Sequence, residues 1–140
     1  MKTESMPLVI MLEDDRDRID RFSAILANRA TLLYWRTADA FIDAYSHLPQ
    51  IPQLIALDHD LFVDSVGDPD PGDGREVAKY LATQTPIVPV LIHSTNWIAA
   101  ESMLSTLREA AWNVERIAPI GEDWIEADWY PMVNAKFHIW

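Results

Sequence analysis

Short apolar runs alternate with segments of helical periodicity along most of this chain, and this alternation limits the fold more than any other feature. Five apolar runs predict strands, at Leu8–Leu12, Thr31–Trp35, Leu54–Leu57, Val88–Ile92 and about Val114–Ala118. Between them, four segments repeat apolar residues at helical spacing, over Arg16–Asn28, Ala38–Tyr45, about Asp73–Thr83 and about Trp97–Trp112. This pattern predicts an α/β fold, with a doubly wound, five-stranded parallel sheet and helices on both of its faces.

The length and composition indicate a single domain. A chain of 140 residues, 49% hydrophobic and 24% charged, suffices for one sizeable core. We therefore expect one domain over 1–140, with its core at about 7–119 and a tryptophan-rich extension over 120–140. The aromatic residues of that extension are Trp124, Trp129, Tyr130, Phe137 and Trp140. Terminal tryptophans usually pack onto the domain's own surface; a partner interface or a base-stacking platform is the alternative.

Net charge and cysteine content exclude several classes of function. The formal net charge of −11 disfavours non-specific binding to duplex nucleic acid, but it does not exclude a nucleotide or a single RNA end in a local pocket. The chain has no cysteine, which excludes disulfides, thiolate zinc sites and cysteine nucleophiles. The apolar run Leu8–Leu12 is too short for a signal-peptide core or a membrane span, so we expect a soluble, cytoplasmic protein without membrane contact.

Polar clusters follow three of the predicted strands, at the point where each strand ends. They are Glu13-Asp14-Asp15, Asp58-His59-Asp60 and His93-Ser94-Thr95-Asn96. Ligands of open α/β sheets bind outside the carboxyl ends of the strands, so these clusters are the candidate site. Carboxylates this close repel one another unless a cation neutralises them, and oxygen-rich sites favour Mg²⁺ or Mn²⁺.

Each cluster also has an ordinary structural explanation. Asp14 and Asp15 would suit the N-terminus of the first helix, where negative charge is favourable. His59 and His93 would be partly buried, hydrogen-bonded histidines. Ser94, Thr95 or Asn96 would cap the following helix. The convergence of all three clusters at one edge of the sheet favours a functional site over these separate explanations.

The acids and the serine resemble those of a response-regulator receiver domain. The matching residues are Glu13-Asp14-Asp15 after the first strand, Asp58 after the third and Ser94 after the fourth. The resemblance implies a flavodoxin-like sheet with strand order 2-1-3-4-5, Mg²⁺ bound by the acids and a phosphoryl group accepted by Asp58. This chain departs from receivers at the fifth strand, where Ala118 stands in place of the usual lysine and Arg116 is the nearest base.

Three longer segments are similar to the cyclic-phosphate-processing receiver family. They are Leu57-Asp58-His59-Asp60-Leu61, the stretch from Asp73 to Leu81, and Ile92-His93-Ser94-Thr95-Asn96. That family combines receiver acids with two histidines and is thought to act on cyclic phosphates at nucleotide or RNA ends. Glu13 departs from its first motif, in which a Leu-Asp-Asp run is more typical.

The resemblance and the residue chemistry together give a hypothesis for each side chain. Asp14, Asp15 and Asp58 would hold the metal ion, with His59 and His93 as general base and acid in either order. Asp60 would orient a histidine, while Ser94 and Asn96 would donate hydrogen bonds to the phosphate.

Three functions fit these observations, and we rank them in order. The first is a metal-dependent phosphoesterase acting on cyclic phosphates. The second is a two-component receiver phosphorylated on Asp58. The third is a degenerate receiver that binds a protein partner or forms a homodimer. The histidine pair favours the first function, and the absent lysine disfavours the second.

Overall fold

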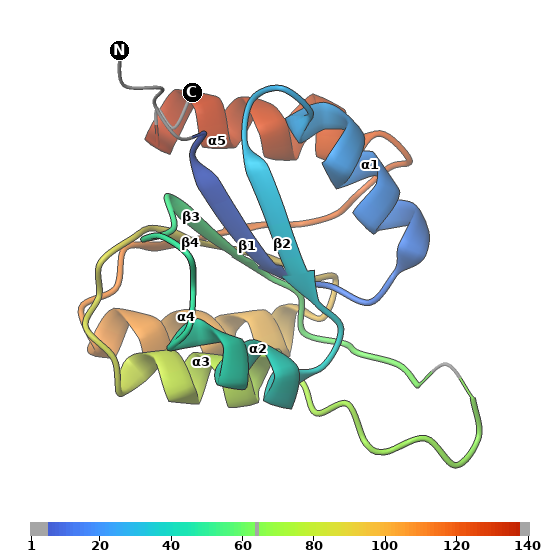
Figure 1. The fold of residues 1–140 in the computed structure, drawn as a ribbon, viewed down its shortest axis with the longest axis vertical. Helices are drawn as coiled ribbons and strands as arrows, with labels where there is room; N and C mark the ends of the chain where they lie inside the picture. The colour runs from blue at the N-terminus through green and yellow to red at the C-terminus, as the bar shows by residue number, and fades with distance from the viewer. Residues whose placement is uncertain (1–5, 64, 138–140) are drawn as a thin grey trace.

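Five parallel strands form one sheet in the order β2-β1-β3-β4-β5 (Figure 1). The computed structural model describes residues 6–63 and 65–137. The strands are β1 (Leu8–Leu12), β2 (Thr31–Trp35), β3 (Leu54–Leu57), β4 (Val90–His93) and β5 (Val114–Ile117). The predicted α/β fold and strand order are therefore confirmed. Every residue of β1, β3 and β4 is buried, which is why these strands are uninterrupted apolar runs.

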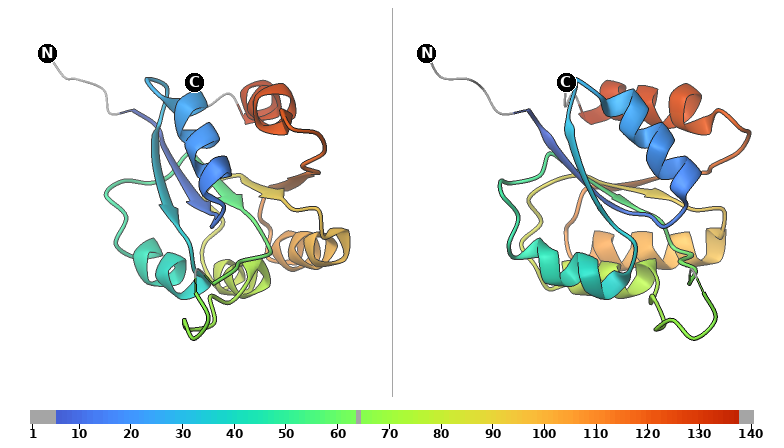
Figure 2. Two further views of the ribbon diagram at one scale, coloured as in Figure 1. Left: turned by 90° about the vertical axis from the view of Figure 1, so that its right-hand side faces the viewer. Right: turned by 45° about the vertical axis from the view of Figure 1, so that its right-hand side comes forward.

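Helices cover both faces of the sheet (Figure 2). They are α1 (Arg16–Leu26), α2 (Ala38–Tyr45), α3 (Gly74–Ala82), α4 (Trp97–Glu109), the π-helical turn η1 (Ile125–Trp129) and α5 (Tyr130–Phe137). Helices α1 and α5 lie on one face, and α2, α3 and α4 lie on the other. Four helices begin at a residue whose side chain accepts a backbone N–H of the first turn, namely Asp15, Thr37, Asp73 and Asn96.

The C-terminal segment forms a helix that the sequence analysis does not predict. Trp124 and Trp129 are buried and pack edge-on against Phe22 of α1. The expectation that the tail tryptophans pack onto the domain itself is confirmed for these two; Trp140 lies outside the described residues. Pro131 cannot donate a helical hydrogen bond, and the wide turn η1 precedes it. Both features obscure the helical pattern.

The order of the strands brings the three polar clusters together. β1 pairs with β3, and β3 pairs with β4, all in parallel. The residues that follow these strands therefore meet at one edge of the sheet. Within the described parts of the chain, no helix is both long and apolar enough to cross a membrane.

Candidate functional site

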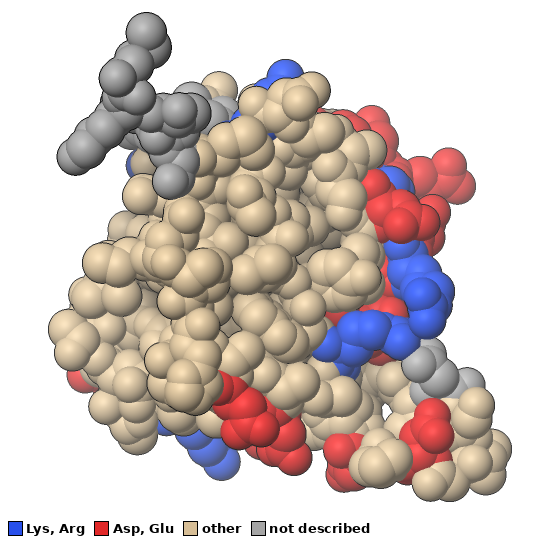
Figure 3. All heavy atoms as spheres, in the orientation of Figure 1, with Lys and Arg blue, Asp and Glu red and all other residues tan. Residues whose placement is uncertain are grey.

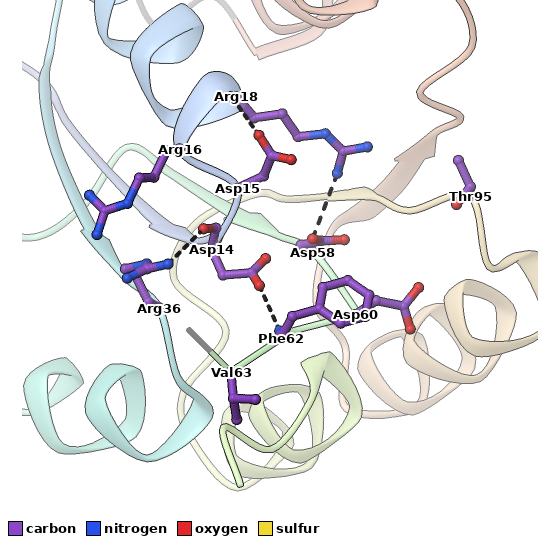
Figure 4. Close-up of a pocket in the computed structure, with 10 residues that line it drawn as sticks. All are labelled: Asp14, Asp15, Arg16, Arg18, Arg36, Asp58, Asp60, Phe62, Val63 and Thr95. Atoms are coloured by element: carbon purple, nitrogen blue, oxygen red, sulfur yellow. Dashed lines mark hydrogen bonds and ion pairs between the residues drawn. The ribbon is translucent and has the colours of Figure 1, made fainter. Parts of the chain in front are cut away.

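A pocket of about 460 Å³ opens at the carboxyl edge of the sheet (Figure 4). It is lined by residues from the ends of β1, β2, β3 and β4 and from the start of α1, namely Asp14, Asp15, Arg16, Arg18, Arg36, Asp58, Asp60, Phe62, Val63 and Thr95. The predicted residues Asp14, Asp15, Asp58 and Asp60 are among them. His59, His93, Ser94 and Asn96 lie near the pocket but do not line it.

Glu13 and His93 form a buried pair beneath the pocket. Both side chains have no exposed surface, and His93 Nε2 lies 2.7 Å from Glu13 Oε2. Phe22 and Trp124 pack against the His93 ring, which shields it from solvent. Burial alone would raise the pKa of Glu13, but the hydrogen bond and electrostatic interaction with His93 outweigh it and lower that pKa. Glu13 is therefore held as a carboxylate.

Asp58 lies beside this pair and is only 4% exposed. Burial and the charge of Glu13 raise the pKa of Asp58 to about 9, although the His59 N–H and Arg18 act in the opposite direction. One ligand atom each from Glu13, Asp58 and His93 lies within 4.8 Å of the other two. Two buried carboxylates at this separation repel each other, and a divalent cation would relieve that repulsion.

Asp14 is fixed by contacts with the loop after β3 and with the residue after β2. Its carboxylate accepts the Phe62 N–H at 2.6 Å, and its carbonyl accepts a hydrogen bond from Arg36 at 3.1 Å. Burial raises the pKa of Asp14, as does the charge of Glu13. Asp14 therefore faces the pocket from a fixed position next to Asp58.

Asp15 lines the pocket and is also bonded to the backbone of α1. Its carboxylate accepts the Arg18 N–H at 3.0 Å and caps α1, which is the structural alternative considered for this residue. Glu13, two residues earlier, lies beside Asp58. The buried acids near Asp58 are therefore Glu13 and Asp14, a shift of one residue from the predicted pair.

The residues after β4 mainly shape the start of α4. Asn96 caps α4 by accepting the Ala99 N–H at 3.1 Å, and Ser94 Oγ accepts the Asn96 N–H at the same distance. Thr95, to which the sequence analysis gave no phosphate contact, is the residue of this cluster that lines the pocket.

His59 and Asp60 form a hydrogen-bonded dyad. His59 Nδ1 lies 2.8 Å from Asp60 Oδ1, which is the contact that an orienting role for Asp60 requires. His59 Nε2 is buried, has no hydrogen-bond partner among the described residues, and lies 3.7 Å from the Asp73 carboxylate. One carboxylate thus fixes the ring while the second nitrogen keeps its hydrogen-bonding capacity.

Three arginines that the sequence analysis did not assign face these acids. Arg16 and Arg18 belong to the first turn of α1, and Arg36 follows β2. The Arg18 guanidinium lies 3.8 Å from Asp58 and 3.9 Å from Glu13. Figure 3 shows basic side chains between acidic ones at this edge of the molecule. Guanidinium groups bind phosphate oxygens well, so the pocket offers groups for both a cation and a phosphate.

The receiver lysine has no equivalent at the pocket. Ala118 stands at the expected position, and the Arg116 guanidinium donates to the Ser94 carbonyl at 2.8 Å. No lysine is among the residues that line the pocket in the described parts of the chain.

Comparison with known proteins gives a family and a fold. The family model described as the cyclic-phosphate processing receiver domain matches residues 8–109. No curated protein matches the chain in sequence.

Solved structures with the same fold are receiver domains. The phosphorylated cyanobacterial phytochrome response regulator RcpA is 21% identical, with a TM-score of 0.61 over 84% of each chain. The non-phosphorylated HemR receiver domain from Leptospira biflexa is 20% identical, with a TM-score of 0.62 over 83% of this chain and 84% of that one. The signal receiver domain of an HD domain-containing protein from Pseudomonas fluorescens is 13% identical, with a TM-score of 0.61 over 84% and 86%.

Proposed function

The chain belongs to the cyclic-phosphate processing receiver domain family, and from this premise we propose that it is a cation-dependent phosphoesterase acting on cyclic phosphates of nucleotides or RNA ends. The observation that carries the proposal is the composition of the pocket. Carboxylates suited to a divalent cation and three arginines suited to a phosphate line the same pocket.

The charges of the site support a divalent cation. Four aspartates and three arginines line the pocket, and Glu13 lies behind them. These carboxylates outnumber the guanidinium groups, and a divalent cation such as Mg²⁺ or Mn²⁺ would offset their excess negative charge. Asp14, Asp58 and Glu13 offer the hard oxygen ligands that these ions prefer. A bound cation would polarise a non-bridging phosphate oxygen and stabilise the charge that develops during hydrolysis.

The arginines and Thr95 would position the phosphate. Arg18 and Arg36 reach the pocket from α1 and from the end of β2, so they contact the phosphate from two sides. The hydroxyl of Thr95 is the donor available from the residues after β4. These contacts leave the phosphorus open to attack by water, which forms a new P–O bond as the bond to one ring oxygen breaks.

His59 is our candidate for proton transfer, with Asp60 as the group that orients it. Its Nε2 would take a proton from the attacking water or give one to the departing oxygen. His59 and His93 both lie outside the pocket lining, but His93 has no exposed surface and its Nε2 is already bonded to Glu13, whereas His59 Nε2 has no hydrogen-bond partner among the described residues. We therefore give His93 a positioning role, in which it holds Glu13 ionised and in place for the cation.

A phosphoryl-accepting receiver is the second candidate, and the shared fold favours it. Asp58 follows β3, where a receiver accepts its phosphoryl group. Arg116, however, is bound to the Ser94 carbonyl, so an aspartyl phosphate would lack the usual lysine partner. A receiver that only binds a protein partner is a third candidate, which needs none of these side chains.

Phosphorus NMR of the purified chain with 2′,3′-cyclic nucleotides and Mg²⁺ or Mn²⁺ tests the proposal. We expect conversion of the cyclic phosphate to a monoester, which Asp58→Asn abolishes. The matched control is Asp43→Asn, an exposed aspartate on α2 that lines no described pocket. If neither metal gives conversion, the phosphoesterase proposal fails. Acetyl phosphate in the same assay then separates a phosphorylated receiver from a protein-binding one.

A further inference from the structure

A second cavity adjoins the first along the loop between β3 and α3. Its volume is about 370 Å³, and it is lined by Arg36, Thr37, Asp39, Phe62, Val63, Asp68, Pro69, Asp70 and Pro71. Arg36, Phe62 and Val63 line both cavities. A ligand whose phosphate occupies the first pocket can therefore extend into the second without leaving the protein surface. Each volume falls within the range of small-molecule sites.

Hydrogen bonds hold the walls of the second cavity. At one end of the loop, the Phe62 N–H is bonded to Asp14 at 2.6 Å. At the other end, the Pro71 carbonyl accepts the Ala38 N–H at 2.8 Å, at the start of α2. The loop is thus tied to β1 through Asp14 and to α2 through Ala38, and the cavity lies between these two attachments.

The charge of the second cavity limits what it can hold. Asp39, Asp68 and Asp70 contribute three carboxylates, whereas Arg36 is the one basic residue among the described residues that line it and is shared with the first pocket. A second phosphate group would be repelled here. An uncharged group with N–H and O–H donors suits these walls better, because carboxylates accept hydrogen bonds from such donors.

Phe62 stands at the junction of the two cavities with 73% of its surface exposed. An exposed ring at this position gives a planar ligand a stacking surface. Trp97, at the start of α4, is a second exposed aromatic residue at this edge, at 63%, but it lines neither cavity. The second cavity therefore favours Phe62 as the stacking residue.

We propose that the second cavity is a nucleoside subsite, in which a base stacks on Phe62 while the attached phosphate occupies the arginine-lined pocket. This inference rests on the proposed function for the phosphate end only. It adds where the base of the substrate binds, and it names the residue on which that base stacks.

Calorimetric binding tests the subsite without requiring turnover. The full chain with Mg²⁺ is titrated with adenosine 3′-monophosphate and with ribose 5-phosphate, which has no base. We expect the nucleotide to bind about 10-fold more tightly, in line with the usual effect of base stacking on an aromatic side chain. Phe62→Ala should remove this preference, and Phe62→Tyr should retain it. Trp97→Ala is the matched control and should leave the preference unchanged.

The outcomes separate the subsite from the proposed hydrolysis. Equal affinity for the two ligands, or a preference that survives Phe62→Ala, overturns the subsite even if cyclic phosphates are hydrolysed. A preference that depends on Phe62 supports the subsite even if no hydrolysis occurs. An oligoribonucleotide with a 3′-phosphate distinguishes an RNA end from a free nucleotide as the ligand. If it binds at least as tightly as the mononucleotide, the subsite accepts an RNA end. If it binds more weakly, the ligand is a free nucleotide.

Discussion

At the scale of single residues, the most consequential feature is the pair of buried carboxyl groups of Glu13 and Asp58. Glu13 is ionised because His93 is bonded to it, and its charge acts on Asp58. The unfolded chain has no such constraint, since both carboxyls are then solvated. Ionisation of Asp58 in the folded protein is therefore unfavourable, because the charge of Glu13 repels it. A bound metal ion would relieve this repulsion.

This unfavourable ionisation predicts how stability depends on pH. The pKa of Asp58 is about 9 in the folded protein and near 3.8 in the unfolded chain, so between these values only the folded state holds the proton. The stabilisation that the Asp58 proton gives the folded state is complete below about pH 4 and declines as the pH rises toward 9. Asp58→Asn remains neutral, and we expect it to exceed the wild type in unfolding free energy by on the order of 2 kcal/mol at pH 8.

Urea denaturation in EDTA at pH 5 and pH 8 measures this difference. The advantage of Asp58→Asn should be larger at pH 8, and Mg²⁺ should restore stability to the wild type but not to the variant. An advantage of the same size at both pH values would show that Asp58 is not protonated in the folded protein at pH 5.

The Glu13–His93 pair gives a second prediction at this scale. We expect His93→Ala to weaken Mg²⁺ binding about 10-fold, because residues that orient a metal ligand typically contribute that much affinity. Calorimetry with Mg²⁺ measures the effect, and His93→Gln should recover part of it by donating to Glu13. His47→Ala, at an exposed position two residues after the end of α2, is the control. Unchanged Mg²⁺ affinity in His93→Ala would remove His93 from the site.

At the scale of elements, the site depends on how closely α3 approaches the end of β3. Gly74 is the first residue of α3, and its N–H donates to the His59 carbonyl at 3.0 Å. A Cβ on Gly74 would collide with the Asp58 carbonyl oxygen and with the end of Met103. The missing side chain therefore lets the helix pack directly against the backbone that carries Asp58 and His59.

Gly74→Ala should consequently destabilise the fold by about 1–3 kcal/mol and displace Asp58. Urea denaturation measures the first effect, and Mg²⁺ affinity measures the second. Gly67→Ala is the comparison: its Cβ meets nothing within 4 Å, although its positive φ also disfavours alanine. It should lower stability without changing Mg²⁺ affinity. If Gly74→Ala binds Mg²⁺ as the wild type does, the close approach is not needed for the site.

The elements also explain how much of the fold could be predicted from the sequence. Parallel strands buried on both faces appear as apolar runs, so β1 and β3 were evident with their correct ends. Thr37 and Asp73 each accept a backbone N–H in the first turn of α2 and α3, and residues of this type mark helix starts within a sequence. The C-terminal helix was missed because Pro131 and the π-helical turn before it disguise a segment whose packing depends on α1.

Only the part of the site that directly follows the strands could be predicted from the sequence. Asp14 and Asp58 follow adjacent strands, so their proximity follows from the strand order. The cap that Asp15 forms follows from its place directly before Arg16, where the predicted helix begins. The contact of Glu13 with His93 joins the ends of two strands, and no local sequence pattern shows it. Arg18 reaches the pocket from the first turn of α1, which no strand-end argument detects, whereas Arg36 directly follows β2 at the same edge of the sheet.

At the scale of the whole molecule, the sheet separates two hydrophobic cores. One lies against α2, α3 and α4, and the other lies between the sheet and α1 with the C-terminal helix. The second core contains Phe22 and Leu26 of α1, together with Trp124, Trp129 and Val133. The family match ends at residue 109, before this C-terminal contribution. The C-terminal extension therefore contributes buried side chains to one of the two hydrophobic cores.

A chain that ends at Pro119 should then fail to fold cooperatively. It would expose Phe22 and lose Trp129, a fully buried side chain whose deletion alone costs about 3–5 kcal/mol of a total stability of roughly 5–15 kcal/mol. Trp124 also covers the ring of His93, so the truncation would admit water to the Glu13–His93 pair and weaken Mg²⁺ binding. A chain that ends at Phe137 keeps every described residue and is the matched control. Thermal unfolding followed by circular dichroism, with size-exclusion chromatography, compares the two. If the shorter chain unfolds at the same temperature as the control and remains monomeric, the C-terminal helix is an appendage to a domain that ends near residue 119.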